Sequence, residues 1–312
     1  MSNADATGAI LIAGPTASGK SALAVALAER LGGLVINADS MQLYRELRLV
    51  SARPGPEDEA RAPHRLYGVL PAAEAFSTGA WLGLVAAALD AARASGLRPI
   101  LVGGTGLYFR ALTEGFAEVP AIPADIRTRC RSLAEDQGLE AVRSALAPLD
   151  PDAAGRLQDL QRLTRALEVV LATGRTLAAW QAERPGAPLL PQDRVRTVVL
   201  APPRAWLHAR IARRAGLMLS EEGIAEVRDL LALGLPATLP AMRAIGVKEI
   251  GGLLAGAIDR AEVERQLVVA TRQYAKRQET FFRGQLAAWP RLDPSGVSEN
   301  ALLDQVLAGP RG

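Results

Sequence analysis

The stretch Gly14-Pro15-Thr16-Ala17-Ser18-Gly19-Lys20-Ser21 decides the fold of this 312-residue chain. It follows an apolar run, residues 9–13, and precedes an alanine-rich segment, residues 22–31, so the predicted order is strand, glycine-bounded loop, helix. In that context a G-x4-G-K-S match predicts a P-loop, and the alternative is an ordinary glycine-containing turn. The backbone N–H groups of a P-loop and of the helix N-terminus converge on one spot, where they hold phosphate oxygens. We therefore predict that these eight residues bind a di- or triphosphate.

Two side chains of this loop have predicted roles of their own. Lys20 would place a positive point charge on the bound phosphates, and the Ser21 hydroxyl is of the kind that holds Mg²⁺ beside them. The loop alone does not distinguish ATP or another nucleotide from a different diphosphate ester.

The composition limits the class of protein. With 49% hydrophobic and 22% charged residues, the chain can bury a large core and is long enough for two domains. No apolar run in the sequence reaches membrane-spanning length, and we predict a cytoplasmic protein with no membrane partner. The single cysteine, Cys130, excludes an internal disulfide, and with only His64 and His208 beside it a Cys/His metal cluster is excluded too.

The basic residues are informative in kind and in distribution. Of the 36 basic residues only Lys20, Lys248 and Lys276 are lysines, which indicates positions that need a compact ammonium, although chance is the alternative for the last two. Residues 193–312 hold 17 basic and 13 acidic side chains, whereas residues 1–118 hold 10 and 11. This surplus in the last third predicts a polyanionic partner.

Two further apolar runs, residues 34–37 and 99–102, are predicted strands of a parallel sheet. Ligands of open α/β sheets bind at the carboxyl ends of strands, so Asp39 is expected beside the P-loop; a helix cap is its alternative role. The second run ends in Gly103-Gly104-Thr105, where P-loop NTPases usually carry a Mg²⁺-binding aspartate. This difference weakens the hypothesis of ordinary ATP hydrolysis.

The last third contains two predicted helices that carry basic residues. The first, residues 203–218, presents Arg210 and Arg214 on one face, which suits either a helix that neutralises leaving phosphates or a surface pair. The second, residues 261–282, interleaves basic and aromatic side chains, which fits an RNA-facing surface or, for the aromatics, a place in the core. Beyond Trp289 we expect a tail with one short helix and no chemistry.

Residues 119–192 are predicted to form an inserted, all-helical domain. Helical patterns cover residues 124–137, 139–146, 161–173 and 176–183. The flanking parts, residues 1–118 and 193–312, are predicted to form one discontinuous core of the α/β class, with a P-loop NTPase-like parallel sheet flanked by helices.

Several motifs resemble those of the tRNA dimethylallyltransferases, also called tRNA isopentenyltransferases. After G-P-T-A-S-G-K-S come D-S-x-Q-x-Y at residues 39–44 and G-G-T-G-L-Y at residues 103–108. The similarity continues with Q-R-L-T-R-A-L-E at 161–168, M-R-A-I-G at 242–246 and T-R-Q-Y-A-K-R-Q at 271–278. These motifs occur in the family's order and are together specific, whereas the P-loop alone is not.

The resemblance implies a reaction. Enzymes of this family move a dimethylallyl group from dimethylallyl diphosphate to N6 of adenine 37, beside the anticodon of tRNAs that read codons beginning with U. It implies that the P-loop holds the diphosphate with Mg²⁺, and that Lys20 and Arg214 stabilise the departing charge. Asp39 is expected to accept a proton from N6, and Thr105 to bond the adenine amine, with turn chemistry as the alternative for Thr105.

The resemblance also implies contacts with the tRNA anticodon stem-loop. The adenine must leave its stack to reach the site, and Gln42 and the segment around Lys276 are expected to hold the loop open while the inserted domain grips the stem-loop. The implied tRNA-binding residues are Asp39, Ser40, Met41, Gln42, Thr105, Arg127, Gln161, Arg162, Leu163, Thr164, Arg165, Arg243, Lys248, Lys276, Arg277, Gln278 and Arg283. We expect a monomer.

The chain departs from the family's pattern in four places. Residues 51–54 read S-A-R-P instead of a sequence like T-A-K-P, and residues 158–160 read Q-D-L where a histidine-proline-asparagine approach is usual. Both changes affect local phosphate or tRNA contacts. Val247 in place of an aromatic residue and Phe281 in place of tryptophan are packing changes.

Three other functions use a similar loop. A small-molecule or nucleoside kinase would need no RNA, and the absent strand-end aspartate and the basic last third count against it. An RNA-binding protein with a nucleotide-gated, non-catalytic P-loop would not need Asp39 and Thr105 at neighbouring strand ends. An adenylate isopentenyltransferase uses free nucleotide, whereas the inserted domain and the basic helix favour tRNA.

Overall fold

The computed structural model describes residues 8–117, 119–183 and 186–309. The chain forms two compact units, one made of Met1–Glu114 with Leu189–Gly312 and the other of Gly115–Pro188. The predicted insertion, residues 119–192, begins and ends four residues later than the second unit. Within the predicted domains, residues 118, 184 and 185 lie outside the described residues. Within the described part of the chain, no helix has the length and apolar character needed to cross a membrane.

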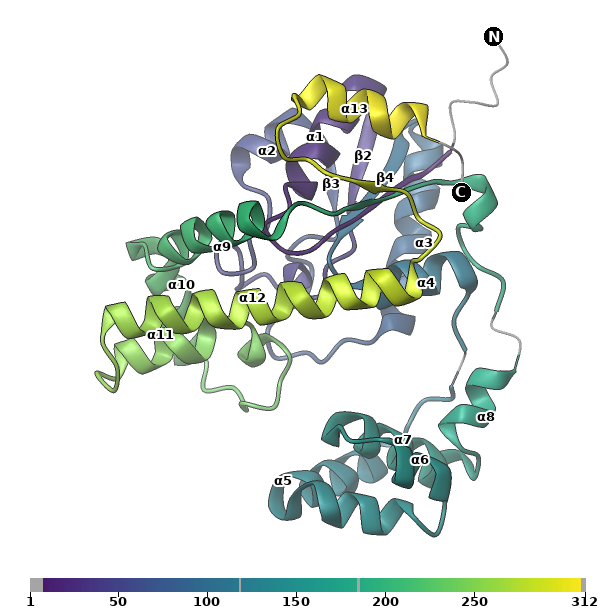
Figure 1. Ribbon diagram of the computed structural model, residues 1–312. Helices are drawn as coiled ribbons and strands as arrows, with labels where there is room; N and C mark the ends of the chain where they lie inside the picture. Colours follow the sequence, from purple (N-terminus) through teal and green to yellow (C-terminus); the bar gives the residue numbers. More distant parts are fainter. Residues whose placement is uncertain (1–7, 118, 184–185, 310–312) are drawn as a thin grey trace. The chain divides into compact units, whose positions relative to one another are not determined.

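The first unit is built on one parallel sheet, part of which is labelled in Figure 1. The strand order of the sheet is β3-β2-β4-β1-β5-β6. The strands are β1 (Ile10–Ala13), β2 (Gly33–Asn37), β3 (His64–Arg65), β4 (Arg98–Gly103), β5 (Arg196–Leu200) and β6 (Arg291–Leu292). At the centre, Ile12 of β1 pairs with Val102 on one side and Val198 on the other. This sheet confirms the predicted fold class, and the two-residue edge strands β3 and β6 are additions to it.

Both faces of the sheet are covered by helices, so its strands alternate between two apolar layers. Ile10 and Ile12 pack toward α1 (Lys20–Leu31) and α13 (Glu299–Ala308). Leu11 and Ala13 pack toward α3 (Thr78–Ala94) and α4 (Gly106–Glu114). Two short helices, η2 (Met41–Leu43) and α2 (Pro56–Arg61), lie in the connection from β2 to β3.

The C-terminal segment is part of this core. The short helix expected beyond Trp289 is present as α13, but the segment is not a tail. Leu302, Leu303 and Val306 of α13 are buried with α1, and Arg30 forms a 2.8 Å ion pair with Asp304. The sequence showed a short helix rich in Leu and Val. It did not show that this helix packs against α1, which is far away in the chain.

The remaining helices of the first unit are η3 (Gln192–Arg194), α9 (Arg204–Met218), α10 (Glu221–Ala232), η4 (Ala241–Arg243), α11 (Val247–Leu254) and α12 (Arg260–Gln285). Two of them, α9 and α12, contact the P-loop. α9 and α12 pack together through Leu207, Ile211 and Ala275. Phe282 of α12 is fully buried and Phe281 packs against the same core, so these aromatics are core residues rather than an RNA surface.

The second unit consists of α5 (Ala124–Leu146), α6 (Pro151–Arg156), α7 (Leu160–Thr173) and α8 (Leu177–Ala182). It has its own small core, in which Cys130 and Val142 of α5 meet Leu163 and Leu167 of α7. Gly138 interrupts α5 with a φ of 75°, a conformation that side-chain-bearing residues rarely adopt. Asp159 caps α7 by accepting the Arg162 N–H at 2.9 Å.

Candidate active site

The P-loop connects β1 to α1 as predicted. Gly14 must lack a side chain, because a Cβ there would lie 2.7 Å from Ser18 Oγ and 3.2 Å from the Leu200 Cβ. Gly19, with a φ of 89°, precedes α1 and offers no side chain to cap it. The first N–H groups of α1 therefore remain available to an anionic ligand.

Lys20 is held in a buried position at the start of α1. Its side chain is 8% exposed, and Nζ donates to the carbonyl of Pro15 at 3.3 Å. Burial lowers the pKa of Lys20 to about 8; the negative charge of Asp39 opposes this shift and the nearby Arg214 adds to it. A bound anion would favour the charged ammonium again.

Two arginines of α9 attach this helix to the P-loop. Arg214 donates to the Thr16 hydroxyl and, at 2.9 Å, to the carbonyl of Val50, while its buried Nε has no partner among the described residues. Arg210 donates from Nε to the carbonyl of Ala17 at 2.7 Å. The pair is therefore not a simple surface pair: two positive charges lie against the phosphate loop.

Asp39 lies just beyond β2 and is 9% exposed. Its backbone N–H donates to Asn37 Oδ1 at 2.8 Å, and its carboxylate Oδ1 accepts the N–H of Met41, the first residue of η2, at 3.1 Å. This bond resembles the helix-capping role that was the alternative for Asp39. The second carboxylate oxygen, Oδ2, lies against the turn after β4, since a Cβ on Gly104 would be 3.0 Å from it. One oxygen thus shapes the turn while the other faces the neighbouring strand end.

The negative charge of Asp39 also acts on the surrounding phenols. Burial, and secondarily Asp39, raises the pKa of Tyr67, Tyr108 and Tyr274. These hydroxyls therefore stay protonated around neutral pH.

Thr105 joins the ends of β2 and β4. Its backbone N–H donates to the carbonyl of Ala38 at 3.2 Å, and its Oγ1 accepts the Ser40 N–H at 3.0 Å and donates to Ser40 Oγ at 3.3 Å. The hydroxyl therefore has the structural role of a turn, and its bond to the adenine amine stays a prediction.

The chain is similar to proteins of one family over most of its length. The family model described as IPP transferase matches residues 42–285, and the one described as isopentenyl transferase matches residues 7–76. A tRNA dimethylallyltransferase of Rhizobium etli strain CIAT 652 is 52% identical over 289 residues, which cover 92% of this chain and 97% of that protein. This chain belongs to the tRNA dimethylallyltransferase family.

Other family members agree with this assignment. The tRNA dimethylallyltransferase of Rhodopseudomonas palustris strain BisB18 is 52% identical over 293 residues, covering 93% of this chain and 92% of that protein. The crystal structure of the tRNA isopentenylpyrophosphate transferase of Bacillus halodurans is 31% identical and has a TM-score of 0.67, covering 96% of this chain and 94% of that chain. The resemblance of the motifs is confirmed.

Two glutamines of the family motifs are buried rather than exposed to a nucleic acid. Gln42, 6% exposed, donates to the carbonyls of Ser51 and Ala52 at 3.1 and 2.8 Å. Gln278, 5% exposed, accepts the Thr16 N–H at 2.8 Å and donates to the carbonyl of Gly104 at 3.0 Å. Their amides are bonded inside the first unit, and their contact with tRNA stays a prediction.

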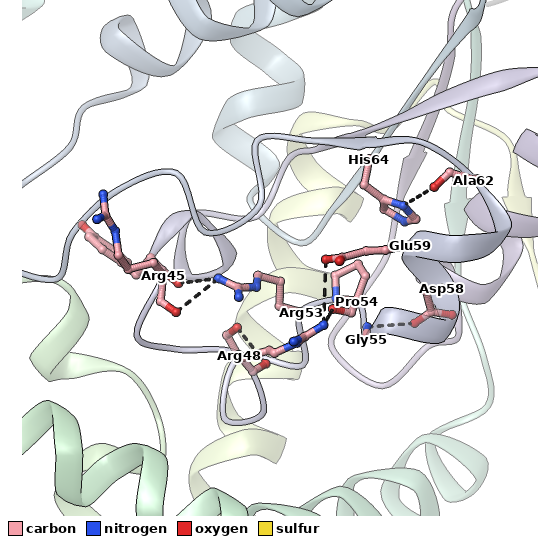
Figure 2. Close-up of polar contacts among 11 residues, drawn as sticks. Arg45, Arg48, Arg53, Pro54, Gly55, Asp58, Glu59, Ala62 and His64 are labelled. Atoms are coloured by element: carbon pink, nitrogen blue, oxygen red, sulfur yellow. Dashed lines mark hydrogen bonds and ion pairs between the residues drawn. The ribbon is translucent and has the colours of Figure 1, made fainter.

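Residues 51–54, which depart from the family's pattern, are stabilised by hydrogen bonds within their own loop. Arg53 turns back onto its own loop and donates to the carbonyls of Tyr44 and Arg45 at 3.2 and 3.4 Å (Figure 2). Arg48 donates to the carbonyl of Pro54 at 3.3 Å. Because Arg53 replaces lysine with a longer, forked donor, it bonds backbone carbonyls and stabilises the loop that Gln42 also holds.

Sequence reasoning missed one residue that supports this loop. Glu226 of α10 accepts the N–H groups of Leu49 and Val50 at 2.7 and 3.0 Å, and Val50 in turn accepts a bond from Arg214. No spacing in the sequence indicates this contact, since Glu226 and the loop are more than 170 residues apart.

The other predicted tRNA contacts fall into two groups. In the first unit, five basic side chains of η4, α11 and α12 are exposed: Arg243, Lys248, Lys276, Arg277 and Arg283. The Arg277 guanidinium lies 5.7 Å from the centre of the Tyr274 ring. In the second unit Arg127, Gln161 and Arg162 are exposed and Arg165 is half-buried.

Two further residues of the second group are buried. Leu163 is fully buried in the core of the second unit, and Thr164 is buried with its hydroxyl donating to the carbonyl of Leu160 at 2.8 Å. Both side chains face the inside of the helical unit and support the helix that carries Arg162, and their contact with tRNA stays a prediction.

Proposed function

We propose that this protein transfers a dimethylallyl group from dimethylallyl diphosphate to N6 of adenine 37 in tRNAs that read codons beginning with U. The observation that carries the proposal is the Asp39 carboxylate in the electrostatic field of Lys20 and Arg214. A proton acceptor beside an anion clamp suits a reaction in which an amine is alkylated while a diphosphate leaves.

In the proposed reaction N6 attacks C1 of the dimethylallyl group, the C1–O bond breaks, and its electron pair leaves with the diphosphate. The amine is a weak nucleophile because its lone pair is delocalised into the adenine ring. Asp39 Oδ2, which faces the strand end at Gly104, accepts the N6 proton as positive charge develops on nitrogen. General base catalysis of this kind contributes about 10²- to 10⁴-fold in rate.

The departing diphosphate is held by groups that are already in place. The N–H groups at the start of α1, the Lys20 ammonium and the Arg214 guanidinium surround the loop and stabilise the negative charge that concentrates on the leaving oxygens. These groups do not require an ATP γ-phosphate, which agrees with a β4 strand that ends in glycine instead of a Mg²⁺-binding aspartate.

We infer that Mg²⁺ is the cofactor. Among the described residues no group of three His, Cys, Asp or Glu side chains is placed to hold a metal ion. Mg²⁺ usually keeps several waters and takes one or two protein ligands with substrate phosphates, so the half-buried Ser21 hydroxyl and the diphosphate form a suitable donor set. When bound, the ion would neutralise charge on the leaving diphosphate.

The acceptor is proposed to be the anticodon stem-loop, bound by a single copy of the chain in the cytoplasm. Exposed basic side chains on α11 and α12 and on α5 and α7 suit phosphate contacts, which give affinity independent of sequence. Ser40 and Met41 lie next to Asp39 and are proposed to border the flipped adenine.

The test is incubation of the purified protein with Mg²⁺, labelled dimethylallyl diphosphate and unmodified tRNA carrying adenines at positions 36 and 37. The matched substrate has guanine at position 37. We expect label only in the first tRNA. Label in neither tRNA, together with γ-phosphate transfer from ATP, would replace this proposal with a kinase.

A further inference from the structure

Gln278 connects two loops that serve different substrates in the proposed function. It lies on α12, whose neighbouring residues Lys276 and Arg277 are exposed, yet its own side chain is 5% exposed. Its amide oxygen accepts from the Thr16 N–H of the P-loop, and its amide nitrogen donates to the carbonyl of Gly104. The P-loop belongs to the diphosphate side of the site, and Gly104 lies beside Asp39 on the adenine side.

The packing around this amide is tight. A Cβ built on Gly104 would stand 2.1 Å from Gln278 Nε2 and 3.0 Å from Asp39 Oδ2, so the glycine, the amide and the carboxylate meet in one small volume. Arg214 fixes Thr16 from the other side through its hydroxyl. Thr16 is thus held at its backbone by α12 and at its side chain by α9.

We propose that Gln278 is a positioning residue that sets the distance between the diphosphate and the adenine base. Alkylation requires the two reacting atoms to be about 3–3.5 Å apart and aligned, and a misplacement of about 1 Å costs on the order of 10²-fold in rate. The Thr16 N–H donates to this amide and therefore has a structural role. The remaining N–H groups of the loop and of α1 hold the diphosphate. This inference rests on the proposed function.

Two uncharged variants of the full chain separate positioning from RNA contact. Gln278→Met keeps the length of the side chain and removes both bonds, whereas Gln278→Asn keeps the amide but is too short to reach both loops. Gln273→Met, at an exposed position of the same helix, is the matched control. We would measure kcat and KM for dimethylallyl diphosphate with saturating tRNA, and separately the Kd for tRNA.

For both Gln278 variants we expect kcat to fall about 10- to 100-fold, with the tRNA Kd changed less than about twofold and the control unchanged. A tRNA Kd weakened as much as kcat falls would show an RNA contact and overturn the proposal, as would an unchanged kcat. Loss of folding in both variants, seen as a lost thermal transition, would show a purely structural role and overturn it too. A wild-type protein that transfers no prenyl group would instead refute the proposed function itself.

Discussion

The P-loop and the helical unit Gly115–Pro188 hold their functional side chains in opposite ways. Lys20 and Gln278 beside the loop are buried and bonded to backbone groups, some of them more than 170 residues away. Arg127 and Arg162 of the helical unit are exposed, on helices packed around a small core. If the proposed roles hold, the chemistry depends on fixed geometry around the P-loop, whereas tRNA recognition depends in part on charge displayed by the helical unit.

The largest effect is expected from a buried residue near the P-loop, Asp39. Asp39→Asn keeps an acceptor for the Met41 N–H but removes the proposed base, so we expect kcat to fall about 10²- to 10⁴-fold while the tRNA Kd is retained. Single-turnover prenyl transfer measures this, with Asp90→Asn on the exposed face of α3 as the control. Turnover near that of the wild type in a folded, tRNA-bound variant would refute Asp39 as the base.

Arg214 of α9 should be distinguishable from its exposed neighbour Arg213. Arg214→Gln removes a charged donor from the diphosphate clamp, and we expect kcat to fall about 10²- to 10³-fold. Arg213→Gln changes the same charge one residue away at an exposed position and should stay within about twofold. Equal losses in the two variants would mean that net charge, not the placement of Arg214, matters.

The lowered pKa of Lys20 predicts a pH dependence of donor binding. Below its pKa of about 8 the ammonium is already charged, whereas above it the site must take up a proton when the diphosphate binds. We expect the Kd for dimethylallyl diphosphate, measured by equilibrium dialysis without tRNA, to be flat below about pH 8 and then to rise by up to roughly tenfold per pH unit.

Lys20→Gln is the control for this profile. It should bind more weakly and show no rise in Kd above pH 8, because the titrating ammonium is gone. A wild-type Kd that stays flat through this range would contradict the assignment of the charge to Lys20.

The smallest effect is expected in the helical unit. Arg162→Gln should weaken tRNA binding only a few-fold, reduce the slope of log Kd against log salt by about one, and leave kcat at saturating tRNA unchanged. Filter binding at several salt concentrations measures this, with Arg156→Gln, at an exposed end of α6, as the control. A fall in kcat at saturating tRNA would show that the helical unit takes part in the chemistry, and would contradict the proposed separation of catalysis from recognition.

Local sequence patterns predicted the elements that have a long apolar run or a characteristic glycine spacing. The strands near residues 10–13, 34–37 and 99–102 are long and apolar enough to be recognised, and the P-loop glycines follow from backbone geometry. The edge strands β3 and β6 were missed because two residues show no periodicity. The helix α13 was predicted but its place in the core was not, because a short apolar helix does not reveal the surface it will cover.

For the site, the sequence by itself determined which chemical groups are present: a phosphate-binding loop, a carboxylate after a strand, a basic helix and the family's motifs. Only the tertiary structure decided what each group contacts. Gln278 and Leu163 lie in motifs beside exposed basic residues, yet the first joins the P-loop to the Gly104 turn and the second fills a core. The physical reason is that a motif fixes side-chain chemistry and local spacing, whereas burial and hydrogen-bond partners depend on segments brought together from distant parts of the chain.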